Sequence, residues 1–149
     1  MALCCRIIGI GVDIIDSRRI RNIIIQSQSR PARLASRILS LSETRSSEWR
    51  ELIRSNQISF MVQFLANRWT AKEAAYKALY PTYKPSWKQL SILKSQKTYP
   101  KPSLELLDLN GSKISNITLH LSLSHDAHNV VATVLASTSN GVEQSNKNY

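Results

Sequence analysis

The sequence predicts one α+β domain, with helices mainly in the first half and an antiparallel or mixed sheet mainly in the second. Apolar residues recur at helical spacing over residues 58–79, a stretch rich in alanine. After Pro81 and Pro85 the period changes to two, which is typical of strands. A chain of 149 residues with 42% apolar content is long enough for one domain and short for two. We expect this domain to span residues 1–137, followed by a polar tail at 138–149.

The chain is predicted to begin with a strand that leads into a helix. Arg6–Ile15 is β-branched, and close packing against a helix is the favoured explanation for Gly9 and Gly11. Asp16 or Ser17 can then cap the helix that follows.

Three more helices are predicted before the chain reaches its proline-rich loop. A short one starts at Pro31, a second runs from Ser42 to Ser55, and the longest covers Ile58–Leu79. The side chains expected to face inward in the last two are Trp49, Leu52, Ile53, Phe60, Phe64, Leu65, Trp69, Ala75 and Leu79.

Four strands are predicted in the second half. Their sequences are LSILKS, SLELLDL, NITLHLSLS and VVATVLAS, at residues 90–95, 103–109, 116–124 and 130–137. The dipeptide Asn110-Gly111 marks a turn between the second and third of them.

The charge of the chain favours anionic partners. The formal net charge of +10 is compatible with nucleic acid, an acidic protein, a phosphate-bearing cofactor or a membrane surface. Its apolar runs are too short to span a bilayer, and the adjacent Cys4 and Cys5 form no zinc or disulfide pattern. The arginine-rich, acid-poor start resembles a very short or uncleaved mitochondrial signal, with the cytoplasm as the alternative location.

Two acidic residues are candidate ligands for a cation. Asp13 ends a buried apolar strand, so it must be solvated, paired or bound to a cation, and position alone favours helix capping. Glu73 can form an ion pair with Lys77 one turn later, which is the simplest explanation from spacing. Because Trp69 shares a helical stripe with Glu73 and Lys77, both are expected to be partly sheltered, as a metal-and-phosphate site would require.

Polar residues also end one of the predicted strands. Ser124 and His125 are adjacent and point to opposite faces, so the serine and imidazole cannot easily activate each other. His125 and His128 are too few for a metal site. The remaining possibilities are a polar strand end or an anion contact; Lys101, between two prolines, is expected to be exposed.

Five segments in a fixed order resemble the small holo-acyl-carrier-protein synthases, which are 4′-phosphopantetheinyl transferases. The segments are GIGVDIIDSRRI, RLASRILSLSE, FLANRWTAKEAAYKAL, the KP pair at Lys101-Pro102 and LHLSLSHDAHNVVATVLA, and they cover the chain from Ile7 to Ala136. The resemblance implies the α+β, AcpS-like fold of these enzymes. The arginine-rich start is similar to that of a mitochondrial, fungal-type member.

The resemblance also implies a reaction. The 4′-phosphopantetheine arm of coenzyme A passes to a serine of apo acyl carrier protein, and adenosine 3′,5′-bisphosphate is released. Asp13 and Glu73 match the magnesium ligands, Glu73 the group that takes the serine proton, and Lys77 a phosphate contact. Magnesium prefers oxygen ligands and commonly takes one or two protein carboxylates, which agrees with this pair.

The remaining implied contacts involve coenzyme A and other subunits. Candidate contacts for the coenzyme phosphates are Arg68, Lys72, Lys101, Ser124 and His125. The resemblance further implies a homotrimer with active sites between subunits and a carrier-docking helix containing Arg18, Arg19 and Arg21. The chain departs from the family pattern after KAL, where YPTYKPSW replaces a glycine-rich turn.

Two alternatives to the enzyme are open. One is a small basic RNA-binding protein of the mitoribosomal type, although the chain has no RNA-recognition signature and the family resemblance implies no nucleic-acid or membrane partner. The other is a catalytically inactive relative that serves as a scaffold.

Overall fold

The computed structural model describes residues 5–94 and 101–139, in which one sheet is combined with five helices and one 3₁₀ turn. The first strand is β1 (Arg6–Asp16). The helices are α1 (Ser17–Ile24), α2 (Arg30–Ile38), α3 (Leu41–Thr44), α4 (Ser47–Ser55) and α5 (Ile58–Leu79), followed by the 3₁₀ turn η1 (Trp87–Gln89). The remaining strands are β2 (Leu90–Lys94), β3 (Pro102–Leu106), β4 (Ile117–Asp126) and β5 (Asn129–Thr138).

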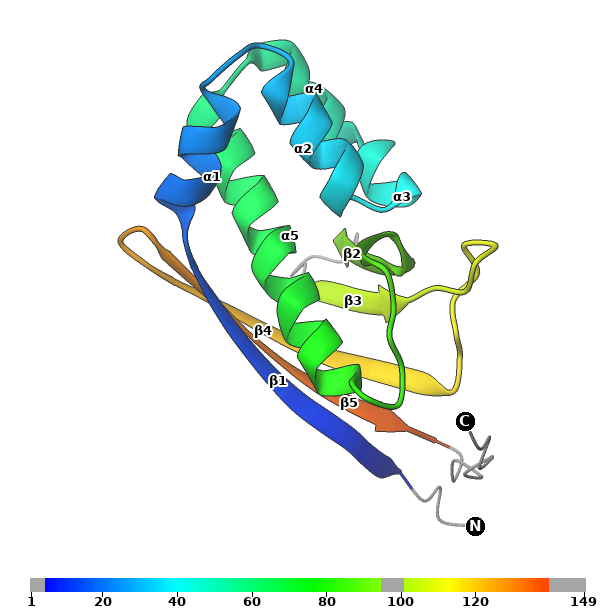
Figure 1. The fold of residues 1–149 in the computed structure, drawn as a ribbon. Helices are drawn as coiled ribbons and strands as arrows, with labels where there is room; N and C mark the ends of the chain where they lie inside the picture. Colours follow the sequence, from blue (N-terminus) through cyan, green and yellow to red (C-terminus); the bar gives the residue numbers. More distant parts are fainter. Residues whose placement is uncertain (1–4, 95–100, 140–149) are drawn as a thin grey trace.

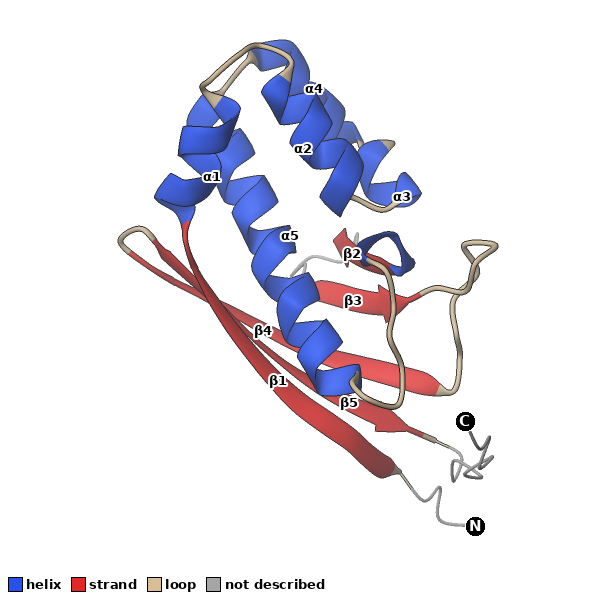
Figure 2. Cartoon of the chain, viewed as in Figure 1, coloured by secondary structure: helices blue, strands red, loops and turns tan. Residues whose placement is uncertain are grey.

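The five strands form a single antiparallel sheet in the order β1-β5-β4-β3-β2. The first strand of the chain therefore pairs with the last, which joins the two ends of the described chain in one sheet. Helix α5 crosses one face of the sheet, and α1–α4 gather at one end of α5 (Figure 1). Figure 2 shows the same separation, and none of the described helices lies on the other face of the sheet. The predicted α+β class, with helices first and most strands second, is confirmed.

Helix α5 takes part in two hydrophobic clusters. Its alanine-rich second half packs on the sheet, where Ala71, Ala74 and Ala78 meet strand residues such as Val134. Its first half packs against the smaller helices through side chains such as Leu65. Because both clusters use α5, the helix fixes the helical end of the molecule relative to the sheet.

Strand β1 is buried on one face only. Gly11 and Ile15 are buried toward α5, whereas Ile10, Val12 and Ile14 point outward and are 64%, 52% and 61% exposed. The prediction of a buried strand therefore holds for one face only, and alternate residues are exposed. Their neighbours on β5 in the same register rows are Leu135, Thr133 and Val131, so the apolar character of the outer face extends in part onto β5.

Several local predictions are corrected by the structure. The helix expected from Ser42 to Ser55 is two helices, α3 and α4, because Ser46 begins a new one by accepting a hydrogen bond from the N–H of Trp49. Phe60 and Ile53, expected to face inward, are 63% and 43% exposed. Strand β5 reaches Thr138, inside the predicted tail, and residues 140–149 of that tail lie outside the described residues.

The helix after β1 begins as predicted. Asp16 is its cap, and its Oδ1 accepts the N–H of Arg18 at 2.9 Å. No helix in the described part of the chain is long and apolar enough to cross a membrane.

Candidate active site

Two glycines bring strand β1 into direct contact with helix α5. A Cβ atom on Gly11 would lie 2.0 Å from the carbonyl oxygen of Ala74, and one on Gly9 would lie 2.5 Å from that of Ala78. Both contacts are with backbone, which cannot move aside as a flexible side chain can. The predicted close approach of strand and helix is confirmed, and it places Asp13 of β1 beside the last turns of α5.

Asp13 pairs with Lys77 of α5. The Lys77 ammonium donates hydrogen bonds to Asp13 Oδ1 at 2.9 Å and to the Val12 carbonyl oxygen at 3.0 Å. The Asp13 side chain is 17% exposed and that of Lys77 is 49% exposed, so the pair lies at the surface of the strand–helix contact. Asp13 is therefore not the helix cap, a role that Asp16 fills.

Glu73 lies one turn before Lys77 on α5 and is half-buried. The expected Glu73–Lys77 ion pair is not among the ion pairs of the described residues, where Lys77 pairs with Asp13 instead. Partial burial and the nearby Asp13 carboxylate raise the pKa of Glu73, and the Lys77 ammonium opposes this effect. Glu73 is thus a carboxylate without a neutralising partner of its own, next to a second carboxylate.

This donor set is suited to magnesium. No group of three or more His, Cys, Asp or Glu side chains suited to a metal occurs within the described residues. A cation here would take two carboxylates, with phosphate oxygens and water completing its shell, which is the usual arrangement for Mg²⁺ and differs from a closed zinc site. Asp13 raises the pKa of Glu73 because two nearby carboxylates repel each other, and a bound cation would relieve this repulsion.

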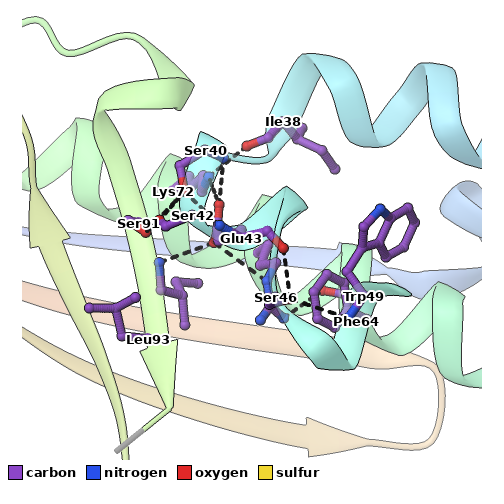
Figure 3. A network of polar contacts seen from close by, with 12 residues as sticks. Ile38, Ser40, Ser42, Glu43, Ser46, Trp49, Phe64, Lys72, Ser91 and Leu93 are labelled. Atoms are coloured by element: carbon purple, nitrogen blue, oxygen red, sulfur yellow. Dashed lines mark hydrogen bonds and ion pairs between the residues drawn. The ribbon is translucent and has the colours of Figure 1, made fainter. Parts of the chain in front are cut away.

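Lys72, predicted to contact the coenzyme, is fully buried. Its ammonium donates to Glu43 Oε2 and to the Ile38 carbonyl oxygen, both at 2.6 Å (Figure 3). It also donates to the Trp87 carbonyl oxygen at 3.1 Å. These three bonds use all three ammonium donors. Burial lowers the pKa of Lys72 to about 8, although the Glu43 carboxylate raises it. The prediction of a phosphate contact is wrong for Lys72, because no donor is left to make it.

Arg68 belongs to the same buried network. Its guanidinium lies over the Phe64 ring. The Nε atom is 3.4 Å from Glu43 Oε1, and this nitrogen itself has no hydrogen-bond partner. Burial lowers the pKa of Arg68, and the carboxylates of Glu43 and Glu48 oppose that shift. Arg68 is only 6% exposed, so its predicted phosphate contact is also wrong for the structure described here.

Glu43 is the residue that the sequence interpretation missed. Its carboxylate accepts hydrogen bonds from Lys72 and from the N–H groups of Ser40 and Ile92, which ties α3, α5 and β2 together (Figure 3). The Ser40–Glu43 spacing is the sequence signature of a capping box, and the structure contains that box. This signal predicts the helix start, but it gives no sign of the buried lysine.

The other predicted contacts lie away from Asp13. His125 faces α5, where Nε2 is 2.7 Å from Asn67 Oδ1, whereas Ser124 is exposed on the outer face in the row of Val131 and Ile14. Strand β5 separates β1 from β4, so Asp13 and His125 lie two strand spacings apart, or roughly 10 Å across the sheet. Lys101 is exposed and directly precedes β3, one strand further away.

The structure therefore brings together Asp13, Glu73 and Lys77 on one flank of α5. Within one chain it keeps His125, Ser124 and Lys101 apart from them.

Sequence comparison identifies the class of protein that carries this site. Residues 9–134 match the model of the 4′-phosphopantetheinyl transferase superfamily. The chain is 34% identical to the holo-[acyl-carrier-protein] synthase of Sodalis glossinidius over 132 residues, which cover 87% of this chain and 96% of the relative. It is 31% identical to that of Geobacillus kaustophilus over 131 residues, which cover 87% and 88%.

Solved structures support the same class. The chain is similar to a holo-(acyl-carrier-protein) synthase from Bacillus anthracis in complex with CoA (3′,5′-ADP), with a TM-score of 0.64, 26% identity and coverage of 89% and 98%. It is also similar to the Helicobacter pylori synthase in complex with coenzyme A, with a TM-score of 0.59, 28% identity and coverage of 85% and 98%. A Plasmodium yoelii structure at 24% identity and a TM-score of 0.69 supports the fold.

The chain belongs to the 4′-phosphopantetheinyl transferase superfamily, as its motifs predict. Within that superfamily it is an enzyme of the holo-[acyl-carrier-protein] synthase type. This result decides against the RNA-binding alternative.

Proposed function

We infer that the chain transfers the 4′-phosphopantetheine group of coenzyme A to a serine of apo acyl carrier protein. The observation that carries this inference is the pair of carboxylates, Asp13 and Glu73, held beside Lys77 in a chain of this family. Coenzyme A is present in the similar Bacillus anthracis and Helicobacter pylori structures.

Asp13 and Glu73 are the proposed magnesium ligands. Bound Mg²⁺ would neutralise negative charge on the diphosphate of coenzyme A as its P–O bond breaks. The two side chains come from different elements, and the glycine contacts of β1 hold their backbones together. Neither ligand is engaged by a buried ion pair, in contrast to Glu43.

Glu73 is also the proposed proton acceptor. The carrier serine must lose its proton as its oxygen attacks the β-phosphate, and a carboxylate at this place can act as the general base. Lys77 is half exposed, so its ammonium can turn from Asp13 toward a phosphate oxygen. In that position it would stabilise the charge on the departing adenosine bisphosphate.

His125, Ser124 and Lys101 are the proposed contacts for the coenzyme phosphates, now without Arg68 and Lys72. All three are exposed. Lys101 and Ser124 can donate a hydrogen bond to an anion, and His125 can do so from both ring nitrogens when its imidazole is protonated. Because they lie apart from Asp13 and Glu73 in one chain, we propose that they serve the carboxylate pair of a neighbouring subunit.

A homotrimer is the proposed assembly. No helix of the described residues covers the outer face of the sheet, which presents Ile10, Val12 and Ile14 at more than half exposure, beside Val131 and Leu135 of β5. An apolar sheet face of this kind favours burial against another copy of the chain. Association through this face would bring the outer side of β4, which carries Ser124, close to a neighbouring subunit.

Acyl carrier protein is the proposed partner of helix α1. Its arginines Arg19 and Arg21 are exposed, whereas hydrogen bonds from Arg18 to Asp16 lower the pKa of Asp16 to about 2 and occupy the Arg18 guanidinium. The two exposed arginines suit an acidic docking partner. Arg18 is the weaker candidate of the three.

A mitochondrial location and membership of the fungal type are also proposals. Both are supported by the arginine-rich, acid-poor start of the sequence. Arg6, Arg18 and Arg37 lie in β1, α1 and α2, so they are part of the folded domain as well.

Intact-mass spectrometry tests the proposed reaction. Apo acyl carrier protein incubated with the chain, coenzyme A and Mg²⁺ is expected to gain the mass of one phosphopantetheine group, and EDTA is expected to prevent that gain. A carrier that stays unmodified under all Mg²⁺ concentrations would point to the inactive scaffold.

A further inference from the structure

One polar contact links helix α5 to the candidate coenzyme contact on strand β4. His125 Nε2 lies 2.7 Å from the side-chain oxygen Oδ1 of Asn67. The same oxygen accepts a hydrogen bond from Gln63 Nε2, also at 2.7 Å. Two donors from different elements therefore converge on one amide oxygen, and the imidazole is held at one nitrogen.

The shared oxygen determines which imidazole nitrogen carries the proton. An amide oxygen is an acceptor only, so a hydrogen bond to it requires a proton on Nε2. If the Asn67 amide alone were rotated by half a turn, its NH₂ group would face the NH₂ group of Gln63, which leaves two donors opposed. The Gln63 contact thus couples the orientation of Asn67 to that of Gln63, and with Asn67 Oδ1 toward the ring, His125 donates from Nε2.

The remaining nitrogen of His125 is free for a ligand. Among the described residues Nδ1 has no protein partner, and the side chain is exposed. As a neutral ring it offers an acceptor at Nδ1, and when protonated it offers an N–H donor there. A phosphate oxygen of coenzyme A would accept a hydrogen bond from Nδ1–H of the protonated ring, while Nε2 stays bound to the protein.

Asn67 lies on a different flank of α5 from Glu73. The two positions are six residues apart, which corresponds to directions about 120° apart around a helix. One helix therefore supports two parts of the chemistry: Glu73 with strand β1, and His125 through Asn67 with strand β4.

We propose that Asn67 is a positioning residue, which, held by Gln63, orients His125 so that Nδ1 faces the phosphates of coenzyme A. The proposal rests on the proposed function of His125 as a coenzyme contact.

Proton NMR tests the contact without any activity measurement. In the wild type we expect a slowly exchanging Nε2–H signal from His125, assigned by its loss in His125→Ala. Asn67→Leu, which is similar in size but cannot accept a hydrogen bond, should lose the signal, whereas Asn67→Asp should retain it. A neutral ring that carries its proton on Nδ1 instead of Nε2, or an Nε2–H signal that survives in Asn67→Leu, would overturn the proposal.

A double-mutant cycle tests the positioning role. We expect Asn67→Leu to weaken binding of coenzyme A about five- to tenfold by calorimetry, and to have no further effect in the His125→Ala background. Equal losses in both backgrounds, or unchanged affinity in the single variant, would contradict the role of Asn67. If the wild type itself binds no coenzyme A, the proposed function has failed, while the NMR result still decides the contact.

Discussion

The Lys77 ammonium lies 2.9 Å from Asp13 Oδ1, so the strand carboxylate proposed to bind magnesium is paired with a protein cation. The Lys77 ammonium and a magnesium ion would compete for the Asp13 carboxylate, because each is attracted to its negative charge. Binding of the metal would therefore release Lys77 toward the phosphates at the same site.

This competition gives a prediction for magnesium affinity. Lys77→Met should bind Mg²⁺ more tightly than the wild type in the absence of coenzyme A, by roughly three- to tenfold, because the competing ammonium is gone. Asp13→Asn should bind it more weakly. Calorimetric titration in metal-free buffer measures both, with the exposed Lys84→Met as the matched control. Weaker binding by Lys77→Met would show that Lys77 does not compete with the metal.

Gly11→Ala should disrupt both the stability of the fold and the geometry of the site. The new Cβ would lie 2.0 Å from the Ala74 carbonyl oxygen and 2.9 Å from Lys77 Cβ, so strand β1 must move away from α5. Overpacking of this kind costs about 3 kcal/mol of unfolding free energy. Urea denaturation measures the loss, and titration of the folded protein should show weaker Mg²⁺ binding. Wild-type values in both experiments would mean that the close approach is not needed.

Lys72→Met should act on stability and leave coenzyme binding unchanged. It leaves the buried Glu43 carboxylate without its main partner, which costs about 3–5 kcal/mol. We expect the lower end of this range, because Arg68 lies 3.4 Å from the same carboxylate. Urea denaturation of Lys72→Met and of the exposed control Lys88→Met tests the difference. Coenzyme A affinity lost from a fully folded, stable Lys72→Met protein would restore Lys72 as a phosphate contact.

Val12→Glu should dissociate the proposed trimer. Val12 is 52% exposed on the outer face of the sheet, where a carboxylate would have to be buried between subunits. Sedimentation velocity should give a trimer for the wild type and a monomer for Val12→Glu. Ile53→Glu, at a 43% exposed position on α4, is the control and should remain trimeric. A wild-type monomer at micromolar concentration would contradict the assembly.

Much of the fold follows from local sequence patterns. The bounds predicted for α5, Ile58–Leu79, are those observed, because its alanine-rich period ends directly before the Pro81 loop. The pairing of β1 with β5 is different, since it joins the two ends of the chain. Alternation within a strand indicates which residues share a face, but not which strand lies beside it.

Local sequence patterns predict the candidate site less well than the fold. Trp69 suggests that the stripe of Glu73 and Lys77 is sheltered, yet the stripe of Arg68 and Lys72 is the buried one. Burial of Lys72 depends on Glu43, which lies 29 residues earlier in the chain and contacts it only in the folded protein. Local periodicity has no information about such a partner, and only the family motifs suggest that Asp13 and Glu73 act together.

The most direct test of the account measures Mg²⁺-dependent transfer to apo acyl carrier protein by the wild type and by Glu73→Gln. Both proteins are incubated with coenzyme A and the carrier is weighed by mass spectrometry. We expect a gain of one phosphopantetheine group with the wild type and none with Glu73→Gln, while circular dichroism shows both proteins folded. Near wild-type transfer by Glu73→Gln across Mg²⁺ concentrations would contradict the role of Glu73 as metal ligand and proton acceptor.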